Sequence, residues 1–239
     1  PLKSRTLPFG AIWTSLNWPD TDVPLGELSQ RYTRANRMVG VMPMGTMPGE
    51  SKQKAALFWS LPQDSYDDWR LRGLNHWKHE ARTLWPALEP FLDQITSPDQ
   101  MTMARYTHGT LRRPFGDSVV YIGDAAHRAS PQLGQGANMA LLDAWALSEA
   151  IKHFPVEKAL PAYARARRGH VTAYQWMSAA FTPFYQSDSK ILPVIRDRVM
   201  FPLSMTPPTK QILTAMVKGT MLPPLGYLTP MDRFEPQDV

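Results

Sequence analysis

Hydrophobic and polar positions alternate in three early segments of the chain, and this pattern predicts β-strands. Residues 9–18 and 55–61 carry apolar side chains at every second position, and residues 31–43 form a third run of the same kind. A period of two places successive side chains on opposite faces of a strand. Both faces carry apolar groups, so we expect a hairpin-rich sheet that is covered on each side, with residues 44–54 forming a turn.

The apolar spacing changes to three and four residues between positions 65 and 95, which predicts a helix. Pro86 and Pro90 should kink or restart it. The stripe of tryptophans along this helix indicates core packing rather than a cofactor site, because aromatic side chains at this spacing bury a large apolar area. His76 and His79 lie three residues apart with no third ligand near them, and we expect no metal site.

Later elements follow the same logic. Residues 101–106 predict a short strand, and residues 137–152 and 156–184 predict two helices, the second ended by Pro183. Frequent prolines in the remaining chain predict short helices joined by rigid turns. We expect the apolar side chains of residues 191–225 to pack against the domain formed by residues 101–165, the alternative being a surface for a membrane or a partner.

Composition narrows the class of protein. The chain has 239 residues, 43% hydrophobic and 20% charged, which is ordinary for a globular protein with a buried core. A net charge of +5 is spread among acidic and apolar residues without any nucleic-acid-binding pattern, so we expect no nucleic-acid partner. The absence of cysteine excludes disulfides and thiolate chemistry and fits a reducing cytoplasm. No run of eighteen apolar residues occurs, which disfavours a membrane protein.

A glycine and an aspartate follow the apolar residues 118–122, whose β-branched and aromatic content predicts a short buried strand. Gly123 ends that strand where no side chain would obstruct a ligand. Asp124 would stand at the carboxyl end of the strand, where open α/β sheets place their ligands, and its carboxylate can accept hydrogen bonds from a polyol. The alternative is an ordinary turn with Asp124 as a helix N-cap.

The sequence Gly134-Gln135-Gly136-Ala137-Asn138 leads into the predicted helix 137–152. The first backbone N–H groups of a helix lack intrahelical partners and carry partial positive charge, so this position can hold negative charge. The helix is nearly apolar all round and should be buried. Asp143 lies within this buried helix, so its carboxylate needs a hydrogen-bond partner. We expect the backbone of a neighbouring loop to be that partner.

The stretch from Val119 to Ala144 resembles the second flavin-binding fingerprint of the class A flavoprotein monooxygenases, the FAD-dependent aromatic hydroxylases of the p-hydroxybenzoate hydroxylase type. Gly-Asp-Ala-Ala-His at 123–127, Pro131, Gly-x-Gly-x-Asn at 134–138 and Asp-Ala at 143–144 fall in register with the family pattern without a gap. A lone glycine pair would not match the family pattern at so many positions.

The resemblance implies a set of FAD-binding residues. Asp124 would bind the ribityl chain, Pro131 would lie beside the isoalloxazine, and backbone N–H groups at the start of the helix would meet the flavin pyrimidine. The full set is Gly123, Asp124, Pro131, Gly134, Gly136, Ala137 and Asn138. We expect His127 to be a structural hydrogen-bonding residue, and we assign no catalytic acid or base.

The same resemblance implies an activity. A FAD-dependent monooxygenase would use NADPH or NADH as a transient reductant and O2 to hydroxylate an aromatic or other electron-rich small molecule through a C4a-hydroperoxyflavin. The phrase at 37–45 resembles a strand of the family's substrate domain, and we expect Trp13, Met42 and Trp59 to line the substrate pocket. The alternatives are a flavin-dependent halogenase or reductase, or a non-catalytic fragment that holds FAD poorly by itself.

Two family motifs are absent from the sequence, the Gly-x-Gly-x-x-Gly turn and the Asp-Gly pair. We therefore expect this chain to be the carboxyl-terminal portion of a longer enzyme, whose N-terminal half is lost by truncation, cleavage or disorder, with a short natural variant as the alternative. The expected fold class is α+β, part of an α/β FAD-binding fold. A mixed or antiparallel substrate-binding sheet with its covering helix would occupy residues 1–100, the returning half of a Rossmann-like FAD domain 101–165, and a helical segment 166–239.

Overall fold

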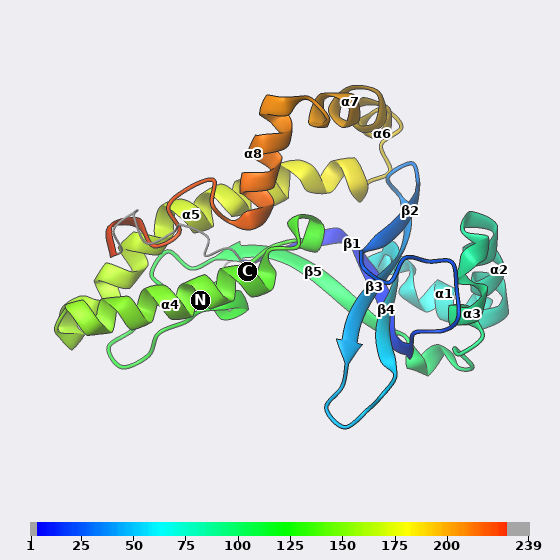
Figure 1. Cartoon of the computed structure of the whole chain (residues 1–239), viewed down its shortest axis with the longest axis horizontal. Helices are drawn as coiled ribbons and strands as arrows, with labels where there is room; N and C mark the ends of the chain where they lie inside the picture. The colour runs from blue at the N-terminus through cyan, green and yellow to red at the C-terminus, as the bar shows by residue number, and fades with distance from the viewer. Residues whose placement is uncertain (1–3, 229–239) are drawn as a thin grey trace. The chain divides into compact units, whose positions relative to one another are not determined.

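The computed structural model describes residues 4–228, which form one six-stranded sheet and a series of helices (Figure 1). The strand order is β2-β3-β4-β1-β5-β6. Adjacent strands pair antiparallel in β1–β4, β2–β3, β3–β4 and β5–β6. The strands are β1 (Ser4–Asn17), β2 (Ser29–Thr33), β3 (Arg37–Thr46), β4 (Gln53–Pro62), β5 (Thr102–Thr110) and β6 (His127–Arg128). The expected α+β class with an antiparallel sheet is confirmed.

One face of the sheet is covered by the helices that follow β4. Ile12 and Val39 lie opposite Trp59 on the neighbouring strands, so these three side chains share that face. All three are at most 4% exposed and belong to a core cluster that also holds Trp77. Trp77 lies edge-on to Trp59, with ring centroids 6.2 Å apart. The tryptophan stripe is therefore core packing, as the spacing predicts.

The helix predicted over residues 65–95 is interrupted twice. The structure has α1 (Tyr66–Arg72), α2 (Leu74–Leu84) and α3 (Glu89–Leu92). Gly73 separates the first two with a φ of 85°, which favours glycine, and Trp85 before Pro86 is extended. The restart at Pro86 follows the prediction, whereas the break at Gly73 was not predicted because the apolar spacing continues through it.

The run 31–43, predicted as a third strand, is a hairpin of β2 and β3. Thr33 pairs with Arg37, and Arg34 between them adopts a φ of 55°, rare for a residue with a side chain. The loop contains neither glycine nor proline, and Asn36 is its single residue typical of turns. Tertiary contacts hold it, because Ala35 is fully buried and its carbonyl accepts a hydrogen bond from the Ser187 N–H at 3.0 Å.

The second face of the sheet is covered in part, which corrects the expectation of a sheet covered on each side. Residues 183–196 pack at one end of it: Gln186 Nε2 donates to Ser60 Oγ at 3.3 Å, and the Arg196 guanidinium lies over the Tyr32 ring at 5.1 Å. Further along the same face Trp13 and Met42 are 41% and 40% exposed. This face therefore keeps an open apolar wall.

The other helices are α4 (Gly136–His153), α5 (Val156–Tyr185), α6 (Leu192–Ile195), α7 (Phe201–Ser204) and α8 (Pro207–Lys218). The two long helices confirm the spacing-based prediction, although α5 continues past Pro183 to Tyr185. Pro183 has no N–H and removes one hydrogen bond from the helix, but the loss of one bond so near its end does not end the helix there. The short helices of the described tail follow the prediction from its prolines.

The expected burial of α4 is wrong for one of its faces. Met139, Asp143 and Ala146 are buried, whereas Leu141 and Ile151 are 71% and 55% exposed. An apolar face at a helix surface needs a neighbouring layer, and the described residues supply that layer to one side of α4 only.

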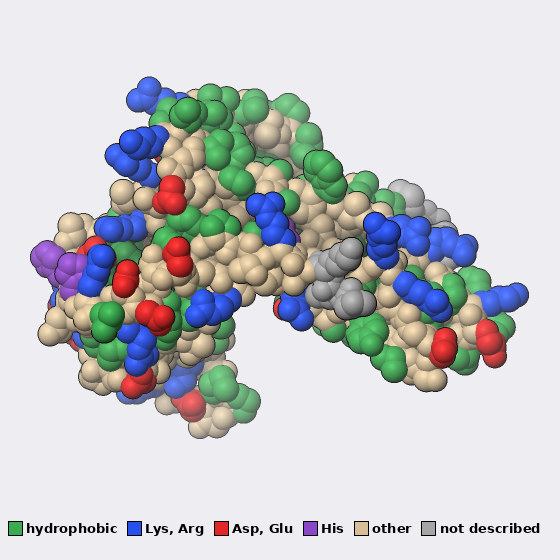
Figure 2. Space-filling model, turned by 180° about the vertical axis from the view of Figure 1, so that it is seen from behind, with side chains coloured by type: hydrophobic (Ala, Val, Ile, Leu, Met, Phe, Trp, Pro, Cys, Tyr) green, Lys and Arg blue, Asp and Glu red, His purple; other side chains and the backbone are tan. Residues whose placement is uncertain are grey.

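The tail also differs from the expectation that its apolar side chains are packed. Met216 and Leu225 are buried, but many large apolar side chains of α6 to α8 lie at the surface, and Figure 2 shows hydrophobic side chains exposed over α7 and α8. The exposed set comprises Ile191, Val194, Ile195, Val199, Phe201, Leu203, Met205 and Ile212.

The chain divides into two compact units. One comprises Thr6–Tyr106 and Pro183–Arg196, and the other comprises Thr107–Thr182 with residues 197–228 and the start of β1. The first unit holds most of the sheet with α1 to α3, and the second holds α4, α5, α7 and α8. These packing units do not test the functional division into 1–100, 101–165 and 166–239, which stays a prediction.

The close approach of β1 to β5 yields a first test. A Cβ added at Gly10 would lie 2.4 Å from the Ala104 carbonyl oxygen, a backbone atom that cannot move aside. We expect Gly10→Ala to lower the free energy of unfolding by about 2 kcal/mol in urea denaturation. Gly26→Ala is the matched control, because an added Cβ there meets nothing within 4 Å, and its effect should stay within about 0.5 kcal/mol. Equal effects of the two substitutions would contradict this account of Gly10.

Candidate functional site

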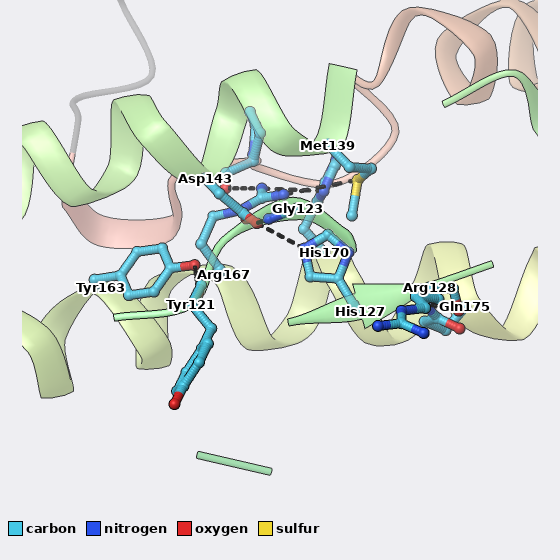
Figure 3. Close-up of polar contacts among 11 residues, drawn as sticks. Tyr121, Gly123, His127, Arg128, Met139, Asp143, Tyr163, Arg167, His170 and Gln175 are labelled. Atoms are coloured by element: carbon cyan, nitrogen blue, oxygen red, sulfur yellow. Dashed lines mark hydrogen bonds and ion pairs between the residues drawn. The ribbon is translucent and has the colours of Figure 1, made fainter. Parts of the chain in front are cut away.

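A buried carboxylate organises the glycine–aspartate turn (Figure 3). Asp143 lies in α4 with no exposed surface. Its Oδ2 accepts the Gly123 backbone N–H at 2.8 Å and lies 2.6 Å from His127 Nε2, and its Oδ1 accepts the Arg167 Nε–H at 2.7 Å. The expected backbone partner of Asp143 is confirmed, and two charged or polar side chains join it.

These partners decide the ionisation of Asp143. Burial raises the pKa of a carboxyl group, but hydrogen bonds and charge from His127, with the Arg167 guanidinium and the Gly123 N–H, outweigh it and hold the pKa of Asp143 below its ordinary value. The carboxylate is therefore a buried anion neutralised in place, and it ties the turn to β6, α4 and α5.

Arg167 extends this network toward the tail. Its Nη1 donates to the Pro224 carbonyl at 2.6 Å and lies 3.1 Å from His170 Nδ1, while His170 Nε2 lies 3.0 Å from the Gly219 carbonyl. Nδ1 must accept and Nε2 must donate, which fixes the neutral tautomer. Burial, assisted by the charge of Arg167, lowers the pKa of His170 to about 4.

The turn itself is a short 3₁₀ segment, Gly123–Ala125, in which Gly123 has a φ of 54°. A Cβ at this position would lie 2.9 Å from the Ala140 Cβ. The glycine is therefore required by the approach of α4 and by its backbone conformation, rather than by room for a ligand, which corrects the sequence-based reason for it.

The strand predicted at 118–122 is not formed. Among the described residues its only ladder contact is an isolated bridge between Val120 and Phe115. Val119, Tyr121 and Ile122 are 53%, 43% and 37% exposed, so the segment is also not buried. A strand needs a hydrogen-bonded neighbour on at least one edge, and the β-forming composition of this segment cannot supply one.

The start of α4 is open. Gly134 adopts a φ of 63° after the 3₁₀ turn Pro131–Leu133, and α4 begins at Gly136 without a side-chain cap. The first intrahelical bond runs from the Met139 N–H to the Gln135 carbonyl at 2.8 Å, so the N–H groups of the three preceding residues have no intrahelical acceptor. An added Cβ at Gly136 would meet nothing within 4 Å.

The predicted cofactor-binding residues lie together in this turn and helix start. Asp124 is exposed, and no hydrogen bond to its carboxylate occurs within residues 4–228. Gly136 and Ala137 are exposed, and the Asn138 side chain donates to Gln135 Oε1 at 2.8 Å. Free N–H donors and a free carboxylate are the groups that a flavin, with its polyol chain and electron-poor ring, can use. The residues present fit FAD.

The three predicted pocket residues do not share one face. Trp13 and Met42 lie on the open wall of the sheet, because Trp13 pairs across with Phe58 and Met42 with Ala56, two residues apart on β4. Trp59 is on the helix-covered face and is 4% exposed. The correction follows from the period-two alternation, which places neighbouring positions of β4 on opposite faces.

The described part of the chain contains neither a metal-binding cluster nor a helix that could span a membrane. No group of three or more His, Asp or Glu side chains there is arranged to hold a metal ion. Within residues 4–228, every helix is too short or too polar to span a bilayer.

Comparison with known proteins identifies the family. A family model described as a FAD binding domain matches residues 8–176. The chain therefore belongs to this FAD-binding family, which confirms the resemblance found in the fingerprint.

Curated relatives include 6-methylpretetramide 4-monooxygenase of Streptomyces rimosus, 28% identical over 169 residues, and 3-(3-hydroxy-phenyl)propionate/3-hydroxycinnamic acid hydroxylase of Burkholderia cenocepacia, 26% identical over 146 residues. These matches cover 68% and 57% of this chain but only 40% and 27% of the relatives. The chain thus spans well under two thirds of their length.

Solved structures agree on the fold. Klebsiella pneumoniae HpxO in complex with FAD and uric acid superposes with a TM-score of 0.70 at 16% identity, covering 95% of this chain and 56% of that one. Pseudomonas aeruginosa PqsL in complex with 2-aminobenzoylacetate gives 0.65 at 19% identity, covering 82% and 53%. At these identities the likeness shows the fold alone.

Sequence reasoning missed Arg167 and His170. Their signal was present, because residues three apart in a helix share a face and both fall in the helix predicted at 156–184. What the sequence lacked was the position of that helix beside Asp143.

The network predicts a large stability effect of Asp143. Asp143→Asn removes the charge that neutralises buried Arg167, and we expect a loss of about 3 kcal/mol or more in the free energy of unfolding. Asp124→Asn is the matched control, since its carboxylate is exposed, and should change stability by less than about 0.5 kcal/mol. Urea denaturation followed by circular dichroism measures both, and a loss below 1 kcal/mol for Asp143→Asn, on the order of a surface change, would refute the role of the network.

The lowered pKa of His170 predicts that the free energy of unfolding depends on pH. Its pKa of about 4 in the folded chain lies below the unfolded value of 6.5, so protons bind preferentially to the unfolded chain. Stability should therefore fall by about 3 kcal/mol as the pH drops from about 6.5 to about 4. His170→Gln should flatten this part of the pH profile, whereas exposed His153→Gln should retain it. An unchanged profile in His170→Gln would show that another group titrates.

Proposed function

We propose that the whole protein is a FAD-dependent monooxygenase that hydroxylates an aromatic or other electron-rich small molecule with NAD(P)H and O2. The observation that carries the proposal is the exposed Asp124 carboxylate beside the uncapped start of α4, both held by the buried Asp143 network. Membership of a FAD-binding family supports it. So do the names of the relatives, a monooxygenase and a hydroxylase.

Each residue of the site has a defined task in this proposal. The Asp124 carboxylate accepts hydrogen bonds from the ribityl hydroxyls, and the N–H groups of Gly136, Ala137 and Asn138 meet the flavin pyrimidine. Pro131, which begins the preceding 3₁₀ turn, contacts the ring and limits access of water to it. Bound FAD supplies the activation of O2 and the oxygen transfer. Gly134 allows the left-handed turn that leads into α4.

The substrate wall is the open face of the sheet. Trp13 and Met42 are partly exposed there, and Phe58 between them lies across Gly40, where an added Cβ would be only 2.3 Å from the Phe58 ring. An apolar, aromatic-lined wall suits a flat aromatic substrate. The relatives' names include a pretetramide and a hydroxyphenylpropionate, both consistent with this class.

In this proposal the N-terminal half of the same enzyme completes the site. The chain covers 56% of HpxO, and the segment 118–122 presents exposed apolar side chains. An N-terminal half with the phosphate-binding turn would cover this segment. The absence of cysteine from this chain fits a reducing compartment, the cytoplasm.

Asp124 provides the test. In the enzyme expressed with its upstream half, Asp124→Ala should weaken FAD binding at least about tenfold, because one charge-assisted hydrogen-bond acceptor is lost. Flavin absorbance near 450 nm during FAD titration measures binding, and substrate-stimulated NAD(P)H oxidation measures activity. Asp117→Ala, at another exposed acid of the same unit, is the control and should bind FAD as the unsubstituted enzyme does.

The outcomes separate the alternatives. A hydroxylated product that takes its oxygen from labelled O2 supports the proposal. A halogenated product in the presence of halide, or turnover that does not need O2, would replace it with a halogenase or a reductase. A colourless protein without oxidase activity would mark a non-catalytic fragment.

A further inference from the structure

We propose that His108 is a positioning residue of the flavin site, which anchors the turn that carries Pro131 only while its imidazole is neutral. The inference deepens the proposed flavin function and rests on it. His108 on β5, Ser130 before Pro131 and Ser178 on α5 all belong to the same compact unit.

Side chains hold both backbone groups of Ser130. Its N–H donates to His108 Nε2 at 2.8 Å, and its carbonyl accepts the Ser178 hydroxyl at 3.1 Å. The strand β6 ends at Arg128, whose carbonyl accepts Gln175 Nε2 at 2.9 Å (Figure 3). Ser130 is 4% exposed, so solvent does not readily replace a lost partner. Beyond the end of β6, His108 therefore supplies the acceptor that a neighbouring strand supplies within a sheet.

These contacts anchor the front of the proposed flavin-binding turn. Ser130 has an extended backbone with a ψ of 144°, which the residue before a proline prefers, and Pro131 begins the 3₁₀ turn that leads to Gly134. The hydrogen bond from the Gly134 N–H to the Pro131 carbonyl, at 2.9 Å, is internal to that turn. The position of the turn therefore depends on its two ends, which are Ser130 before it and the start of α4 after it.

The hydrogen bond to Ser130 requires a neutral His108. Because Nε2 accepts the Ser130 N–H, it carries no proton, and the neutral ring holds its proton on Nδ1. A protonated ring would turn one N–H group toward another and lose the contact. Protonation of His108 would thus release the turn, and with it the contact of Pro131 with the flavin ring.

The charged groups around His108 favour the neutral ring. Burial lowers the pKa of His108, and the positive charge of Arg5 on β1 lowers it further. Arg128 of the paired strand β6 directs its guanidinium to the Asp124 carbonyl, at 3.0 Å from Nε, and Ser178 of α5 is uncharged. The pKa of His108 therefore lies below its ordinary value of 6.5. The contact is kept at neutral pH and is lost as the pH falls through the pKa of the folded protein.

The pH profile of FAD binding tests the proposal in the enzyme expressed with its upstream half. Titration followed by flavin absorbance should give a dissociation constant that rises at least about threefold from about pH 7.5 to about pH 5. His108→Gln offers an amide oxygen that does not titrate, so it should bind FAD within about twofold of the unsubstituted enzyme at the higher pH and lose the rise. His108→Leu offers no acceptor and should bind FAD about tenfold more weakly at both pH values.

Two further variants control for folding and for other titrating groups. Ser178→Ala removes the second contact to Ser130 and should weaken FAD binding at both pH values while keeping the rise. His153→Gln, at an exposed histidine of the same unit, should keep both the affinity and the rise. Circular dichroism at each pH shows whether the compared proteins are folded.

The outcomes distinguish this inference from the proposed function. An enzyme that binds FAD with the same pH profile in His108→Gln as in the unsubstituted form would overturn the role of His108 and leave the flavin function standing. An enzyme that binds no FAD at either pH would overturn both. Hydrogen exchange of the Ser130 amide, measured without FAD, reports on the contact itself. Its protection factor should fall on acidification in the unsubstituted enzyme but not in His108→Gln, and equal protection in the two would overturn the inference.

Discussion

The buried ion pair between Asp143 and Arg167 is the interaction on which the candidate flavin site depends. A carboxylate without solvent contact is tolerated only when its charge and lone pairs are met. Here the Gly123 N–H and His127, which belong to one turn, and Arg167 of the distant helix α5 meet them. The glycine–aspartate turn is thereby fixed relative to the start of α4, and Asp124 is left free at the surface. A site for a polar cofactor needs such rigid support beneath exposed groups.

The same network reaches the tail through His170 and the carbonyl groups of Pro224 and Gly219. Because His170 must stay neutral to accept from Arg167 and donate to Gly219, the ionisation of one side chain is coupled to the docking of a remote segment. The tail that it holds is also the segment with the most exposed apolar surface. Buried polar contacts, rather than hydrophobic packing alone, therefore determine where this segment lies.

The sheet separates two surfaces by simple alternation. Trp13 and Met42 point to the open wall, whereas Trp59 packs into the core beneath α1 and α2. The first surface suits the proposed aromatic substrate, and the second packs against the helices that follow β4. A single strand, β4, contributes to both, so a substitution on it has to be interpreted by the face on which it lies.

The sequence by itself determined the family, the helices at 137–152 and 156–184, the strands around Trp13 and Trp59, and the need of Asp143 for a partner. These features depend on local spacing or on a motif whose residues lie close together in the chain. Only the tertiary structure decided that 31–43 is a hairpin, that 118–122 is not a strand, and that Arg167 neutralises Asp143. Each of these depends on a neighbour that is distant in sequence: Ser187 for the hairpin loop, a pairing strand for 118–122, and a second helix for Asp143. Periodicity specifies which face of an element is apolar, but it does not specify what lies against that face.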